Sequence, residues 1–150
     1  MSPEITERKK IEEALKASEE RYRALVTQSA EAILLIDVTT KRILEANPKA
    51  QELLGYTFEE LCGMTLYDLV PHDREGIDYN TQRVLEKSTP YYIGERSYRR
   101  RDGSLVDIEV SSTLISYEGK EALCSVARDI TERKRAEEAL KESEERYRAV

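Results

Sequence analysis

The residues that could act as acids, nucleophiles or metal ligands are few and scattered along the sequence. His72 is the only histidine, and the two cysteines, Cys62 and Cys124, lie far apart. A single histidine excludes most transition-metal sites and most catalytic sites built on imidazole, since these need several ligands or a histidine beside a nucleophile. We interpret His72, in the sequence VPHDRE, as a loop residue that caps the following helix. The cysteines are typical of reduced, buried thiols.

Phosphotransfer is the other chemistry that single residues suggest. Asp37 ends an apolar run, as the phosphorylated aspartate of a receiver domain does. That reaction also needs an earlier acidic pair for a magnesium ion and a later lysine on a parallel strand, and the sequence has neither. The six glycines form no phosphate-binding loop. A phosphotransfer domain acting through Asp37 or His72 is therefore the weakest alternative, and we expect no catalysis by this chain.

Charge and hydropathy exclude further classes. The chain has 24 basic and 30 acidic residues and a net charge of −6, which argues against non-specific binding to nucleic acid or anionic lipid. The one basic cluster with an aromatic residue, RSYRRR at 96–101, is interpreted as the edge of a hairpin. No apolar run approaches the roughly 18 residues that span a bilayer, and the start lacks the apolar stretch of a secretion signal. We expect a cytoplasmic chain with no membrane insertion.

A repeat frames the sequence. Residues 5–25 and 130–150 are identical at 17 of 21 positions, which indicates a boundary element of a longer tandem array. Both copies have a helical pattern with a heptad seam, and the residues assigned to this dimer seam are Ile11, Leu15, Tyr22, Leu25, Leu140 and Tyr147. The seam predicts a parallel coiled coil that joins two copies of the chain into a homodimer. The alternative is an amphipathic helix that folds back on its own domain.

Between the repeats, the pattern predicts strands at 32–37, 41–46, 92–101, 105–114 and 122–130, and helices at 47–54, 57–61, 66–69 and 73–86. Because strands and helices are segregated along the chain, the fold class is α+β. We expect a five-stranded antiparallel sheet with helices on one face. Amphipathic linker helices at 1–26 and 131–150 flank the domain at 27–130, with Thr6 and Thr131 as their N-caps.

Three segments together resemble the PAS domain with its C-terminal PAC segment: EANPKAQELLGYTFEEL, RRRDGSLVDIEVSSTLI and RDITERK. They have the family's order and spacing, from about residue 29 to residue 134. PAS domains are sensory and dimerisation modules that commonly stand in tandem ahead of histidine kinase or cyclic-dinucleotide output domains. The resemblance implies a signal-transduction module of a two-component system, which relays a ligand- or conformation-borne signal through its linkers to an adjacent PAS or output domain. The alternative is a structural spacer and dimerisation domain with no ligand.

The resemblance also implies a pocket between the inner sheet face and the long helix. The residues expected around it are Arg96, Tyr98, Ile108, Val110, Ser125, Tyr79 and Asn80. An inward Arg96 is costly to desolvate unless it is paired, so it could hold a small anionic ligand such as a carboxylate. The alternatives are that Arg96 pairs with an acidic residue such as Glu75 or Asp78, or reaches solvent.

The cofactor is unknown, and two common ones are not expected. PAS domains that form a flavin adduct carry a reactive cysteine at the position that matches Leu66 here, and Cys62 comes four residues too early. Those that bind haem usually supply a histidine from the long helix, which here has none beyond its start. The best candidate for signal relay is the junction of the last strand with the outgoing helix. There Thr131 is expected to cap the helix, and Asp129 to tie the strand end to its neighbours.

Overall fold

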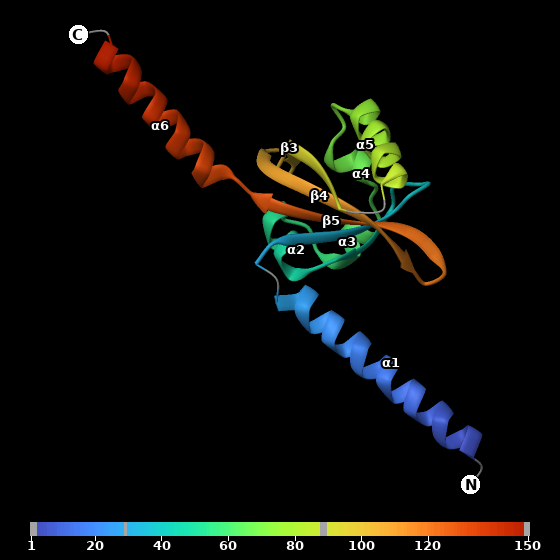
Figure 1. The fold of residues 1–150 in the computed structure, drawn as a ribbon. Helices are drawn as coiled ribbons and strands as arrows, with labels where there is room; N and C mark the ends of the chain where they lie inside the picture. Colours follow the sequence, from blue (N-terminus) through green and yellow to red (C-terminus); the bar gives the residue numbers. More distant parts are fainter. Residues whose placement is uncertain (1–2, 29, 88–89, 149–150) are drawn as a thin grey trace.

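The computed structural model describes residues 3–28, 30–87 and 90–148, with the backbone alone at 3, 4, 18, 19 and 21–28 (Figure 1). Its centre is an antiparallel five-stranded sheet of order β2-β1-β5-β4-β3. The strands are β1 (Ala32–Asp37), β2 (Ile43–Ala46), β3 (Tyr91–Arg99), β4 (Leu105–Tyr117) and β5 (Lys120–Asp129). The helices are α1 (Pro3–Gln28), α2 (Pro48–Leu54), α3 (Phe58–Cys62), α4 (Leu66–Leu69), α5 (Arg74–Glu86) and α6 (Thr131–Arg148). The predicted α+β architecture is confirmed.

The start of β2 differs from the prediction. The strand begins at Ile43 and not at Lys41. Lys41 has a left-handed φ of 63°, which breaks the extended backbone, and Arg42 forms an isolated bridge with Thr65 instead. A lysine in this conformation carries a backbone cost that sequence patterning does not reveal.

The predicted helix start at Asn47 and Pro48 is confirmed. The side chain of Asn47 accepts the amide of Ala50 at 2.9 Å and so caps α2. The same oxygen accepts the amide of Ile33 on β1, and the side-chain amide donates to the carbonyl of Glu31. One polar side chain therefore joins the first strand to the first helix of the domain.

The core lies between the inner face of the sheet and helices α2 to α5. On β4 the residues alternate, and its buried residues are Val106, Ile108, Val110 and Ser112. The turn between β4 and β5 has two positive φ angles, 48° at Glu118 and 78° at Gly119, the geometry that a two-residue hairpin turn prefers. The alternation of apolar and polar residues along β4 thus predicted both this strand and its buried face.

Three predicted helix caps are wrong. Thr6 lies inside α1, which already begins at Pro3, a residue well suited to a first helical turn. Thr131 is the first residue of α6, and its amide and hydroxyl both donate to Oδ1 of Asp129. Asp73, not His72, caps α5 through the amide of Gly76. In each case the helix begins within a few residues of the expected position, and at α5 and α6 the acceptor is a nearby aspartate.

Helices α1 and α6 extend away from the sheet in different directions (Figure 1). Helix α6 buries none of its residues, so it does not fold back on the domain. Of the predicted seam, Ile11, Leu15, Leu140 and Tyr147 are each more than half exposed, whereas the side chains of Tyr22 and Leu25 lie outside the described part. No helix in the described residues has the length and apolar character needed to cross a membrane.

Candidate functional site

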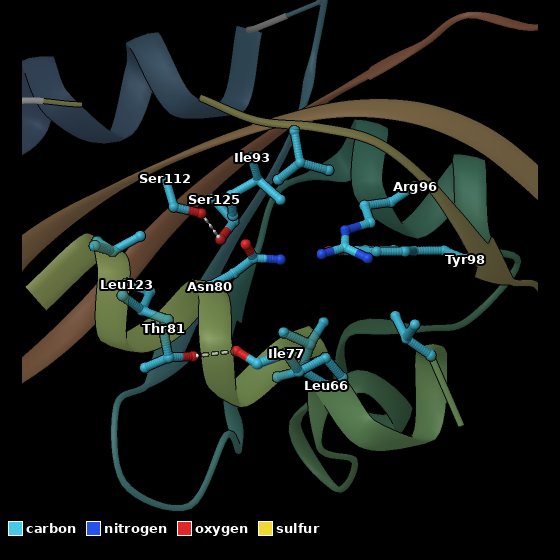
Figure 2. Close-up of a pocket in the computed structure, with 13 residues that line it drawn as sticks. Leu66, Ile77, Asn80, Thr81, Ile93, Arg96, Tyr98, Ser112, Leu123 and Ser125 are labelled. Atoms are coloured by element: carbon cyan, nitrogen blue, oxygen red, sulfur yellow. Dashed lines mark hydrogen bonds between the residues drawn. The ribbon is translucent and has the colours of Figure 1, made fainter. Parts of the chain in front are cut away.

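A small cavity lies between α5 and the inner face of the sheet (Figure 2). Its volume is about 30 Å³, the space that roughly one water molecule occupies. Most of its lining is apolar, and the polar side chains that line it are Asn80, Thr81, Arg96, Ser112 and Ser125. The hydroxyl of Thr81 is satisfied by the carbonyl of Ile77 at 2.8 Å.

Most of the predicted pocket residues line this cavity, with two exceptions. Asn80, Arg96, Tyr98, Val110 and Ser125 are part of its wall. Ile108 is fully buried in the core but is not part of the wall. Tyr79 is 57% exposed, and its hydroxyl accepts the Nε of Arg83 at 3.1 Å, so its prediction as a pocket residue is wrong.

Tyr79 lies outside the cavity wall because of the geometry of α5. Residues that share one face of a helix recur at spacings of three and four, and Ile77, Asn80, Thr81 and Val84 form the face that lines the cavity. Tyr79 falls outside this set. The same spacing could have found Ile77 and Thr81, and the alternation along β4 could have found Ser112.

The polar groups on the wall differ in how well they are paired. The hydroxyls of Ser112 and Ser125 are 2.7 Å apart on neighbouring strands and satisfy each other. Asn80 is only 9% exposed, and no side-chain hydrogen bond joins its amide to another residue in the described part of the chain. The amide is not sealed in the core, since no fully buried polar side-chain atom there lacks a partner. Burial raises the pKa of Tyr98 to about 12, so this side chain is neutral.

Arg96 pairs with an acidic residue, as one of the alternatives held, but the partner is Asp73 and not Glu75 or Asp78. Its Nη1 lies 2.6 Å from Oδ2 of Asp73. Asp73 immediately precedes α5 and faces β3, whereas the carboxylate of Asp78 accepts the hydroxyl of Tyr67 on α4. Several carboxylates lie within reach of an arginine in sequence, and only the packing of α5 on the sheet selects one.

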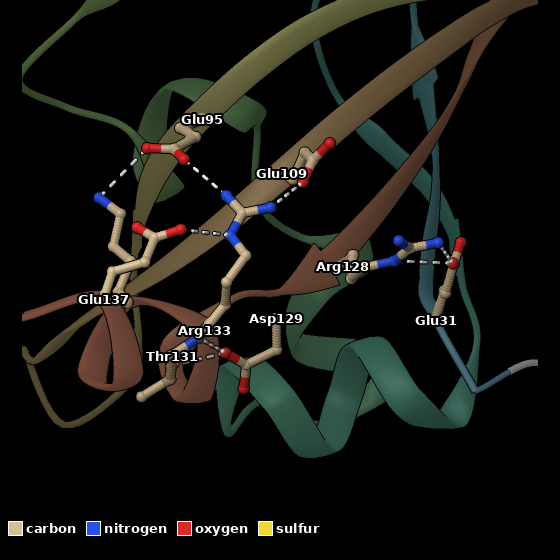
Figure 3. A network of polar contacts seen from close by, with 9 residues as sticks. Glu31, Glu95, Glu109, Arg128, Asp129, Thr131, Arg133 and Glu137 are labelled. Atoms are coloured by element: carbon tan, nitrogen blue, oxygen red, sulfur yellow. Dashed lines mark hydrogen bonds and ion pairs between the residues drawn. The ribbon is translucent and has the colours of Figure 1, made fainter. Parts of the chain in front are cut away.

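The junction with α6 is the second polar site (Figure 3). Oδ1 of Asp129 accepts the Thr131 amide at 2.9 Å and the Thr131 hydroxyl at 2.5 Å. Burial alone would raise the pKa of Asp129, but these two hydrogen bonds and the positive charges of Arg100 and Lys49 together outweigh it, and the pKa is lowered. Ile130 between them is 3% exposed, and its amide donates to the carbonyl of Asp107 on β4.

Arg133 then binds the first turn of α6 to the outer face of the sheet. Its Nη1 lies 2.9 Å from Glu109 on β4, and its Nη2 lies 2.6 Å from Glu95 on β3. Lys134 adds a contact of 3.3 Å to Glu95. The Arg133 hydrogen bond, and after it one from the Tyr92 hydroxyl, lower the pKa of Glu109. Exposed ion pairs are individually weak, but this network joins α6 to two strands.

Sequence reasoning missed Arg133. The alternation of β4 does place Glu109 on the face opposite to the core, and this was the available signal. The pairing itself spans 24 residues from Glu109 and 38 from Glu95, and no local pattern encodes that distance. The relay residues predicted at the junction, Asp129 and Thr131, are in contact with each other.

Comparison with known proteins finds one protein family and several sensor kinases that are similar to this chain. The family described as PAS fold matches residues 20–130. The chain is 35% identical over 130 residues to the sensor histidine kinase TmoS of Ectopseudomonas mendocina, covering 85% of this chain and 13% of that protein. It is 30% identical over 142 residues to sporulation kinase A of Bacillus subtilis, covering 94% of this chain and 23% of that protein. The chain therefore spans less than a quarter of either relative.

A solved structure matches over nearly its whole length. The PAS domain of an HTR-like protein from Haloarcula marismortui superposes with a TM-score of 0.67 at 27% identity. The match covers 81% of this chain and 99% of that one. The similarity therefore includes the sheet and the helices packed on it.

Proposed function

Because the chain belongs to the PAS family, we propose that it is a sensory module that passes a change in its sheet or cavity through α6 to an output domain. One observation carries this proposal: the first turn of α6 is bonded to β3, β4 and β5 at once. The bonds run from Arg133 to Glu95 and Glu109, and from Thr131 to Asp129.

These bonds make α6 responsive to the sheet. Strand β3 is an edge strand and also carries Arg96 and Tyr98 on the cavity wall. A shift of β3 relative to β4 changes the separation of Glu95 and Glu109, which Arg133 bridges. Helix α6 has 18 residues, so it carries a change at its start over about 27 Å. The proposed output is a rotation or displacement of this helix.

The proposed active form is a homodimer. Leu140 and Tyr147 lie at heptad spacing and are exposed in the single chain, and an isolated helix with so narrow an apolar stripe gains stability by packing against a partner. The same helix in a second copy presents a complementary stripe. The domains 1–26, 27–130 and 131–150 then act as incoming linker, sensor and outgoing coiled coil.

A spacer with no ligand is the second candidate, and the small cavity favours it. A space of about 30 Å³ is far below that of a pocket for a drug-sized molecule. Native mass spectrometry of the purified chain separates the two functions. A retained small molecule supports the sensor, and a chain free of bound species under several growth conditions supports the spacer.

The relay is tested by fusing the chain, in heptad register after α6, to the catalytic core of a histidine kinase. Arg133→Ala should alter the autophosphorylation rate of the fusion, because it releases α6 from β3 and β4. Arg101→Ala is the matched control, since Arg101 forms an exposed pair with Glu60 on α3 that does not involve α6. Equal rates for the wild type and Arg133→Ala would contradict the proposed relay.

A further inference from the structure

We propose that the cavity binds a small carboxylic acid anion, whose carboxylate replaces that of Asp73 beside Arg96. The inference rests on the sensory function proposed above and names the ligand class of its cavity. Asp73 is then an internal competitor: its carboxylate occupies the anion position when no ligand is bound.

Asn80 indicates that the cavity has a polar occupant. The residue is nine-tenths buried, its side chain points into the cavity (Figure 2), and no side-chain hydrogen bond joins it to another described residue. No fully buried side-chain polar atom of the described residues lacks a partner, so the Asn80 amide is open to the cavity and not sealed in the core. It can therefore bond to a water molecule or a ligand there. The amide NH₂ is a donor that a carboxylate oxygen can accept.

Arg96 supplies the positive charge. A guanidinium has five N–H donors arranged to bind both oxygens of a carboxylate, yet Asp73 is the only partner of Arg96 among the described residues, at Nη1. The two side chains are 27% and 37% exposed. Asp73 can therefore turn into solvent without burying an unpaired charge, and its departure leaves Arg96 to bind a second carboxylate.

Gly76 shows how closely Asp73 is held. A Cβ added at Gly76 would lie 2.1 Å from Oδ2 and 2.6 Å from Oδ1 of Asp73. The same carboxylate caps α5 through the amide of Gly76 at 3.1 Å. Displacement of Asp73 would therefore remove both a charge pair and a helix cap. Ligand binding is coupled in this way to the first turn of α5.

The size of the space restricts the ligand. The cavity itself has room for about one water molecule, so only a short acid whose carboxylate takes the place of the Asp73 carboxylate can enter it. The walls next to Arg96 and Asn80 are apolar, with Val84, Ile93 and Val110 among them. A short aliphatic monocarboxylate fits both the charge of Arg96 and these walls, and acetate, propionate and butyrate are the probes.

The test is a titration of the intact chain with these three acids, in phosphate buffer, followed by amide NMR. The informative variant is Asp73→Asn, because asparagine caps a helix as well as aspartate does but does not neutralise Arg96. Propionate should bind Asp73→Asn about tenfold more tightly than the wild type, since the competing internal state is lost. Arg96→Gln should abolish binding, and propionamide, a neutral analogue, should not bind.

Glu75→Gln is the matched control. It removes one negative charge from the first turn of α5 at an exposed residue that does not pair with Arg96, so its affinity should equal that of the wild type. The proposal is wrong if none of the acids binds, if Asp73→Asn binds no more tightly than the wild type, or if Glu75→Gln has the same effect. Its failure is distinct from that of the relay, because the effect of Arg133→Ala on the fused kinase is measured without added ligand.

Discussion

Asp129→Ala should loosen the start of α6 while leaving the sheet folded. The substitution removes the acceptor of two hydrogen bonds, from the amide and from the hydroxyl of Thr131. Loss of a helix-capping acceptor costs about 1 kcal/mol, within a range of about 0.5–2 kcal/mol. A change of that size speeds local opening about fivefold.

The chain contains a matched control in Asp102. Its Oδ1 accepts the amide of Ser104 at 2.9 Å and the hydroxyl of Ser104 at 2.6 Å, almost the same geometry, in the turn between β3 and β4. Asp102→Ala therefore removes equivalent bonds at a place that does not contact α6. Asp129→Asn keeps an acceptor oxygen and should restore most of the wild-type behaviour.

Amide hydrogen exchange resolved by NMR is the assay. The amide of Thr131, bonded to Asp129, and the amide of Lys134, bonded to the carbonyl of Ile130, should exchange about fivefold faster in Asp129→Ala. In Asp102→Ala only Ser104 and its turn should change. If Lys134 exchanged at the wild-type rate in Asp129→Ala, or equally fast in both variants, the cap would not hold the helix start.

A fall in pH should weaken the same two hydrogen bonds to Asp129. The pKa of Asp129 lies below its ordinary value of 3.8, so its contribution to stability is complete above that value and is lost as the pH falls through the lowered pKa. The exchange difference between Asp129→Ala and the wild type should therefore shrink in that acidic range and not above it.

Three further outcomes are expected. Leu140→Asp should reduce self-association in sedimentation velocity, whereas Leu105→Asp, a similarly exposed leucine on β4, should not; identical profiles would show that α6 does not mediate the dimer. Burial raises the pKa of Tyr98 to about 12, against 10 for an exposed tyrosine. About 2–3 kcal/mol of the free energy of unfolding is therefore present below pH 10 and should be lost as the pH rises towards 12. Urea unfolding of Tyr98→Phe should not show this loss. Asn47→Ala should cost about 1–3 kcal/mol in the same assay, since the partly buried amide of Ile33 loses its acceptor and α2 loses its cap; a change under about 0.5 kcal/mol would contradict that role.

Local sequence signals predicted the elements well and their edges less well. The pair Asn47 and Pro48 marks a helix start, and Glu118 and Gly119 mark a hairpin, because each signal acts within a few residues. The predicted caps of α1, α5 and α6 were wrong, because a shift of a few residues in the start of a helix changes which side chain lies at the cap. A cap depends on which backbone turn begins first, and two adjacent acceptor side chains are difficult to rank from sequence.

The partners of the long charged side chains could not be predicted. Arg96 has acidic residues at several positions of α5, and only its packing against β3 selects Asp73. Arg133 finds Glu95 and Glu109 because the outer faces of two adjacent strands come together at the start of α6. A flexible side chain several ångströms long can reach many atoms, so distance in the folded chain decides the pairing.

The amino-acid sequence by itself determined the family, the order of strands and helices, and the buried face of β4, because a period of two residues expresses burial directly. It also placed apolar residues at heptad spacing in both repeats, and the coiled coil that this spacing indicates stays a prediction. The tertiary structure decided which residues of α5 line the cavity, how little room that cavity has, and which strands hold α6. These properties depend on contacts between segments far apart in sequence, and packing in three dimensions sets them.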